Sequence, residues 1–136
     1  MQSVKQKLII LLLWSLSVSS YAFSEHWKIE NTSENKRYEA SLSCSEAPKV
    51  GSFQNCWLRL TDQGKSVDNA TINIGGGMPK HQHGLPTMPK VLWSPEHKYY
   101  QIKGLKFSMP GKWILRFLIT FPDNAEQEKL YFSFTI

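Results

Sequence analysis

Apolar residues at every second position near the end of the chain limit the fold more than any other feature. In "KWILRFLIT" and in "KLYFSFTI" every second residue is apolar, and these residues are Trp113, Leu115, Phe117, Ile119, Leu130, Phe132, Phe134 and Ile136. A period of two places such side chains on one face of a β-strand. The turn residues of "FPDNAEQ" separate the two segments. The pattern therefore predicts a buried β-hairpin, with a loop longer than the tightest types.

Shorter segments upstream show the same kind of pattern between turn residues. They are "RYEASLSC" at 37–44, "CWLRLTD" at 56–62, "ATINI" at 70–74 and "YYQIKGLKFS" at 99–108, in which Gly104 is a candidate bulge or bend. No helical periodicity follows residue 24. Six to seven short strands in one small domain predict an all-β fold, a small antiparallel immunoglobulin-like sandwich.

The start of the chain resembles a secretory signal peptide. Lys5 and Lys7 precede an apolar run at 8–13, and small residues follow at 19–22. The run is shorter than the roughly 20 residues that span a bilayer, although an uncleaved anchor is the alternative. We expect a signal peptide at 1–24, cleaved after Ala22 or Ser24, and a domain at 25–136. The domain would then be periplasmic or secreted, with no stable membrane anchor after cleavage.

The cysteines and the distribution of charge limit the covalent bonds and the partners that we expect for the exported part. Cys44 and Cys56 are an even pair, which in an oxidising compartment predicts a disulfide, with two thiol metal ligands as the alternative. Without Lys5 and Lys7, 14 basic residues face 11 acidic ones. The basic residues are scattered along the chain rather than clustered. We therefore expect no nucleic-acid partner.

The segment "GGGMPKHQHGLPTMPKV" at 75–91 holds the candidate binding residues. We expect it to belong to a long connection from Ile74 to about Tyr99, stiffened by its prolines. If the backbone is extended there, His81 and His83 point to the same side, roughly 6.5–7 Å apart. Two imidazoles at that spacing can converge on one metal ion.

Methionines surround this histidine pair. Met78, Met88 and Met109 each precede a proline. Thioether and imidazole ligands together suit copper, above all Cu(I), better than hard ions. His26 and His97 are further donors without a spacing argument. In the alternative interpretation the methionines fill gaps in an apolar core and the histidines are surface residues that bind nothing.

The order of these pieces resembles the YtkA-like and FixH-like group of small exported sandwich domains. The similarity runs from "GGGMPKHQHGLPTMPKV" to "YYQIKGLKFSMPGKWILRF", over about 50–121, and the matching residues are Met78, Pro79, Met109, Pro110, Gly111 and Trp113. The resemblance implies copper handling or assembly of copper-containing oxidases, with a copper-acceptor protein or another envelope protein as partner. "HQHG" stands where other members often carry more methionines. The resemblance therefore leaves the ligand set and the preferred copper oxidation state open.

Motifs for catalysis are missing. The sequence contains no Gly-x-Ser-x-Gly, Cys-x-x-Cys or His-Glu-x-x-His, so we expect a binding domain rather than an enzyme. We predict that it binds or delivers copper through His81, His83, Met78, Met88 and Met109. The alternative is a metal-free interaction domain of the bacterial envelope, which docks through Leu85, Val91, Leu92 and Trp93. Convergence of the methionines and the two histidines at one open point would favour copper, whereas methionines that scatter or are buried separately would count against it.

Overall fold

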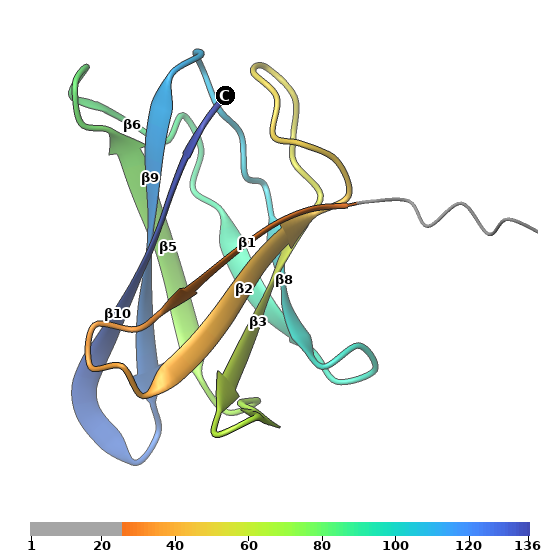
Figure 1. The fold of residues 1–136 in the computed structure, drawn as a ribbon, viewed down its shortest axis with the longest axis vertical. Helices are drawn as coiled ribbons and strands as arrows, with labels where there is room; N and C mark the ends of the chain where they lie inside the picture. The colour runs from red at the N-terminus through yellow and green to blue at the C-terminus, as the bar shows by residue number, and fades with distance from the viewer. Residues whose placement is uncertain (1–25) are drawn as a thin grey trace, which may run out of the picture.

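The computed structural model describes residues 26–136, which form two antiparallel β-sheets packed face to face (Figure 1). One sheet has the order β1-β2-β3-β8-β7, with β4 paired to β3, and the other has the order β10-β9-β5-β6. The strands are β1 (Trp27–Thr32), β2 (Tyr38–Cys44), β3 (Cys56–Asp62), β4 (Lys65–Ser66), β5 (Thr71–Met78), β6 (His83–Gly84), β7 (Lys90–Ser94), β8 (Tyr99–Lys103), β9 (Lys112–Phe121) and β10 (Asn124–Thr135). The predicted small antiparallel sandwich is confirmed.

Four strands were not predicted, β1 and β7 as well as the two-residue strands β4 and β6, and the predicted signal peptide lies outside the described residues. β1 has only a weak alternation, and β7 carries Val91, Leu92 and Trp93 in a row, so neither shows a clear period of two. The predicted strand at 99–108 ends earlier, at Lys103, and Gly104 bends the chain with a φ of 78°. Within residues 26–136 no helix is long and apolar enough to cross a membrane.

The terminal hairpin supplies the centre of the core, as predicted. Leu115 lies opposite Phe132 and Phe117 lies opposite Leu130 in the β9–β10 register. The side chains of this hairpin that are fully buried are Trp113, Leu115, Phe117, Ile119, Leu130 and Phe132. Phe134 and Ile136 were also predicted to be buried, but near the end of the sandwich both are only partly buried.

The turn of this hairpin is tighter than predicted. Phe121 pairs with Asn124, so only Pro122 and Asp123 lie between the two strands. The register then shifts between Asn124 and Glu128, which places the irregularity in β10 rather than in a longer loop. The polar residues that we predicted to form a loop therefore belong to β10, where they surround a bulge.

The prediction that a long connection begins at Ile74 is also wrong. β5 continues through the glycines to Met78, with Gly75 opposite Arg116 and Gly76 opposite Leu115 on β9. A Cβ on Gly76 would lie 2.5 Å from the Ile114 carbonyl oxygen, so only glycine fits this close pairing. The three glycines at 75–77 are therefore part of β5, although a run of glycines is typical of a turn.

A disulfide joins β2 to β3, as predicted. Cys44 and Cys56 are register partners with Cα atoms 4.0 Å apart. The loop that the disulfide closes, residues 45–55, is braced from inside by Gln54. Its side-chain amide donates to the carbonyl oxygens of Lys49 and Ser52 and accepts from the Lys49 N–H. The loop is held in one conformation even though it has no strand of its own.

The last residue of the chain is tied to the turn before β9. Ile136 and Gly111 exchange two backbone hydrogen bonds, at 2.9 and 3.1 Å. Figure 1 shows the end of the chain, the start of β9, the β5–β6 hairpin and the loop after β2 at one end of the sandwich. We call this the hairpin end; its segments are residues 45–55, 78–84, 108–112 and Ile136.

Candidate functional site

Of the two candidate histidines, His81 lies in the turn of the β5–β6 hairpin and His83 is the first residue of β6. Met78 pairs with His83, and the His81 N–H donates to the Met78 carbonyl oxygen at 3.0 Å. Gln82 has a φ of 51°, in the left-handed region. The extended geometry that would place both imidazoles on the same side is therefore absent. Both residues are exposed at the tip of the β5–β6 hairpin.

Each imidazole lines a different shallow hollow. His83 borders a hollow of about 420 Å³, together with Gln82, Arg116 and Tyr131. His81 borders one of about 280 Å³, between Lys80 and Lys112. Pro79 and Ile114 line both hollows and separate them. The two histidines of the hairpin therefore border two neighbouring hollows.

Met78 and Met109 are packing residues at the base of this hairpin. Met78 is 2% exposed, and a Cβ on Gly111 would lie 2.6 Å from its terminal methyl carbon. The Trp113 ring N–H donates to the Met109 carbonyl oxygen at 3.0 Å, and Met109 is partly buried against the core. The two Met-Pro segments of the sequence thus meet in space. Close packing explains their residue types without a metal ion.

Met88 has different surroundings. It lies in the link between β6 and β7 and is 92% exposed. Next to it, the Thr87 hydroxyl donates to the Gly104 carbonyl oxygen at 2.7 Å, which fastens the link to the residue after β8. Of the five predicted ligands, the structure brings Met78, Met109 and the two histidines to the hairpin end. Met88 projects into solvent from a separate segment.

The charge around the histidines is positive. Lys80 and Lys112 line one hollow and Arg116 lines the other, whereas neither hollow is lined by a carboxylate. In residues 26–136 no three or more His, Cys, Asp and Glu side chains lie close enough together to hold a metal ion. A metal ion at this hairpin would therefore depend on thioether ligands as well as imidazoles.

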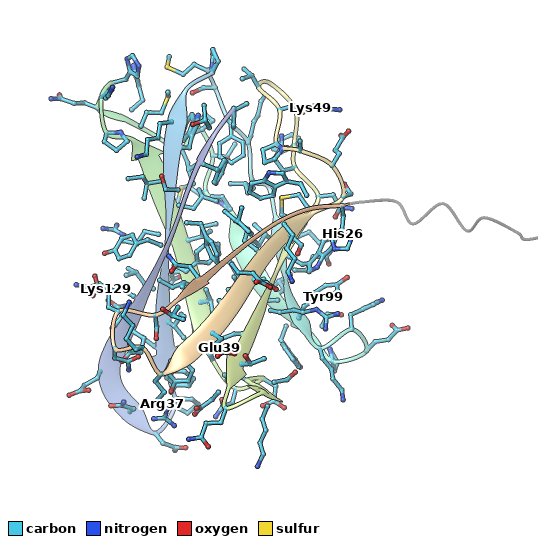
Figure 2. The ribbon with its side chains drawn as sticks, viewed as in Figure 1. His26, Arg37, Glu39, Lys49, Tyr99 and Lys129 are labelled. Atoms are coloured by element: carbon cyan, nitrogen blue, oxygen red, sulfur yellow. A yellow bond between two sulfur atoms is a disulfide. The ribbon has the colours of Figure 1, made fainter. Side chains whose placement is uncertain are left out.

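The other two histidines belong to an aromatic row on the outer face of the larger sheet. The ring centroid of His26 lies 5.6 Å from Trp57, that of Trp57 lies 5.7 Å from Tyr99, and that of Tyr99 lies 5.1 Å from His97. Figure 2 shows His26 and Tyr99 close together beside β2 and β3. Neither histidine joins the hairpin pair. Sequence reasoning missed the row because it depends on how β3 and β8 pair.

Arg116 and Tyr131 were also missed as site residues. They are direct partners across β9 and β10, and Arg116 faces Gly75 on its other side. The sequence signal is an outward-facing arginine opposite a glycine, and it can be recognised only once the register of the sheet is known.

Comparison with known proteins places the chain in one family. The family model described as YtkA-like matches residues 32–117, from the end of β1 into β9. No curated protein and no solved structure matches the chain. The match covers more than half of the sequence and includes all three Met-Pro pairs and the disulfide. The chain therefore belongs to the YtkA-like family of small sandwich domains.

Proposed function

We propose that this domain binds copper in the bacterial envelope and carries or delivers it, with the ion held at the β5–β6 hairpin. The observation behind the proposal is that the hairpin presents His81 and His83 in solvent at the end where Met78 packs against Gly111, two residues after Met109. Imidazole and thioether are the ligand types that suit copper. The disulfide supports an oxidising compartment, such as the periplasm.

The methionines differ in how available they are to an ion. Met109 is partly exposed and can turn its sulfur outward, whereas Met78 is 2% exposed and would have to leave its packing against Gly111. Met88 is free to move but lies on another segment. We therefore assign His81, His83 and Met109 as the principal ligands, with Met78 as the residue that supports them.

The surrounding charge favours the monovalent ion. Lys80 and Lys112 repel a divalent ion twice as strongly as a monovalent one at the same distance, because the Coulomb energy is proportional to the charge. Neutral imidazole and thioether ligands do not offset that repulsion. Cu(I) should therefore bind more tightly than Cu(II).

Anaerobic Cu(I) competition titration of residues 25–136 tests the proposal. His81→Ala with His83→Ala should weaken binding by at least about tenfold, which is about 1.4 kcal/mol. The matched control is His26→Ala with His97→Ala, which removes two exposed histidines from the aromatic row and should leave the affinity unchanged. Met109→Leu should weaken Cu(I) binding and leave Cu(II) binding nearly unaltered.

Two results would remove copper binding from consideration. One is wild-type protein that binds neither ion more tightly than micromolar. The other is a hairpin double variant that binds as tightly as the control double variant.

A metal-free interaction domain is the second candidate, but with a different surface from the predicted one. Leu85, Val91 and Trp93 pack against the core, and only Leu92 of the predicted set is well exposed. Phe53 instead is 68% exposed on the braced loop at the hairpin end. A rigidly presented phenyl ring loses little entropy when it enters a partner's apolar pocket.

Site-specific photo-cross-linking in the native host distinguishes the two candidates. A photoreactive phenylalanine analogue at position 53 should form one discrete protein adduct, and the same analogue at exposed Thr71 on β5 should not. Persistence of the adduct in the His81→Ala, His83→Ala background would support an interaction that needs no metal. Equal labelling from both positions would argue against docking through Phe53.

A further inference from the structure

The larger of the two hollows at the hairpin end has features of a ligand site in its own right. It is a shallow, open hollow of about 420 Å³ on the outer face of the β10-β9-β5-β6 sheet, beside the hairpin. Small-molecule sites usually measure about 300–1,000 Å³ and combine an apolar lining with a few polar groups. Here the apolar part comes from Ile114 and Pro79. The polar groups are Arg116, Tyr131, Gln82 and His83.

The hollow exists because β9 faces a strand segment without side chains. Gly77 is the cross-strand partner of Ile114, and Gly75 is the partner of Arg116. The guanidinium reaches over this bare segment, since its Nη2 atom lies 3.6 Å from where a Cβ on Gly75 would stand. A larger residue at Gly75 would occupy the space next to the cation.

Arg116 is the centre of charge in this hollow. It is exposed and makes no salt bridge with any residue of 26–136. Its neighbours on the outer face, opposite, diagonal and along its own strand, include no carboxylate. They are Gly75, Tyr131, Asn73, Gly77, Lys129, Ser133, Ile114 and Leu118. An anion is the ligand that complements such a surface.

We propose that this hollow binds a small organic carboxylate. The guanidinium offers two parallel N–H donors, the geometry that matches a carboxylate. Tyr131 and Gln82 also line the hollow and carry a hydroxyl and an amide that can donate hydrogen bonds, and the apolar body of the ligand lies against Ile114 and Pro79. The site needs no metal ion, so it stands independently of the proposed copper binding.

A titration of metal-free, ¹⁵N-labelled protein in EDTA tests this site, with benzoate as the probe and benzamide as its neutral counterpart. Benzoate should produce saturable amide shifts at residues 76–84 and 114–116, and benzamide should bind at least tenfold more weakly. Arg116→Gln should weaken benzoate binding at least tenfold. Arg59→Gln, which neutralises an exposed arginine on the other sheet, should leave it unchanged.

Two further variants separate recognition from folding. Arg116→Lys keeps the positive charge but loses the two parallel N–H donors of the guanidinium. This variant should bind benzoate less tightly than wild type and more tightly than Arg116→Gln. Gly75→Val should weaken binding by displacing the guanidinium, while thermal melting shows that the fold persists. No saturation at millimolar benzoate, equal binding of benzamide, or an Arg116→Gln variant that binds as well as wild type would overturn the assignment.

Discussion

At Gly111, two independent constraints act on a single residue. Its φ of 128° lies in the region open to glycine, and the terminal methyl group of Met78 fills the place where a side chain would begin. The same residue also exchanges two backbone hydrogen bonds with Ile136. Backbone strain and steric overlap with Met78 should therefore both destabilise the protein when Gly111 is replaced.

Gly111→Ala should destabilise the protein by about 1–3 kcal/mol, the sum of backbone strain and overpacking. In a Met78→Ala background the same change should cost less, because the obstructing methyl group is gone and only the backbone strain remains. Gly104→Ala is the control for strain alone, since Gly104 has a φ of 78° and open space around its missing Cβ. Urea unfolding of the single and double variants measures each cost. An identical cost in both backgrounds would mean that Met78 is not the obstacle.

The candidate ligands could be named from residue chemistry, but their arrangement could not. Histidine and methionine side chains and their prolines are visible in the sequence. The left-handed Gln82, which separates His81 from His83 in direction, is not. Nor does the sequence show that Met78 is buried and Met88 is exposed, since both occur in a Met-Pro pair. Met78 is the last residue of β5 and packs at Gly111, whereas Met88 lies between β6 and β7, and only the fold shows this difference.

Among the elements, strands with an apolar residue at every second position could be predicted and the others could not. β9 and β10 alternate over most of their length because one face is buried and the other faces solvent. β7 packs apolar residues without a period of two, and the end of β5 consists of glycines that are typical of turns. Close approach of β5 to β9 requires those glycines, and a propensity argument cannot distinguish this use from a turn.

Adjacent glycines in β5 should respond very differently to the same substitution. Gly76→Ala should destabilise the protein by at least about 1–3 kcal/mol, because its Cβ would meet the backbone of Ile114, which cannot move without breaking the ladder. Gly75→Ala should stay within about 0.5 kcal/mol of wild type, as its Cβ meets only the flexible end of Arg116. Thermal and urea unfolding of the pair measure the difference. Equal destabilisation would show that the approach of β5 to β9 is looser than described.

The whole molecule is stabilised by one aromatic and aliphatic core that both sheets share. Phe117 and Phe132 meet edge to face with ring centroids 5.7 Å apart, and Leu58 and Tyr100 are buried on the opposite sheet. The Tyr100 hydroxyl accepts a hydrogen bond from the Ala70 N–H, and burial raises the pKa of this tyrosine. The disulfide fastens β2 to β3 at the hairpin end.

Truncation of this core should have a large effect on the whole domain. Phe117→Ala or Phe132→Ala should cost about 3–5 kcal/mol, because each removes a fully buried ring. Phe53→Ala removes the same side chain from a site that is 68% exposed and should leave the melting temperature nearly unchanged. Calorimetric melting of the three variants compares them directly. Core variants that melt within a few degrees of wild type would contradict the assigned burial.

The pairing of Ile136 with Gly111 has a practical consequence for affinity tags. Any residues added after Ile136 emerge at the hairpin end, beside the turn that precedes β9. A polyhistidine tag placed there would put six or so extra imidazoles next to His81 and His83, and could supply the metal affinity by itself. An acidic tag would likewise compete for Arg116. Titrations with copper or with benzoate therefore call for protein whose carboxyl-terminal tag has been removed, because a tag at this position can imitate either ligand site.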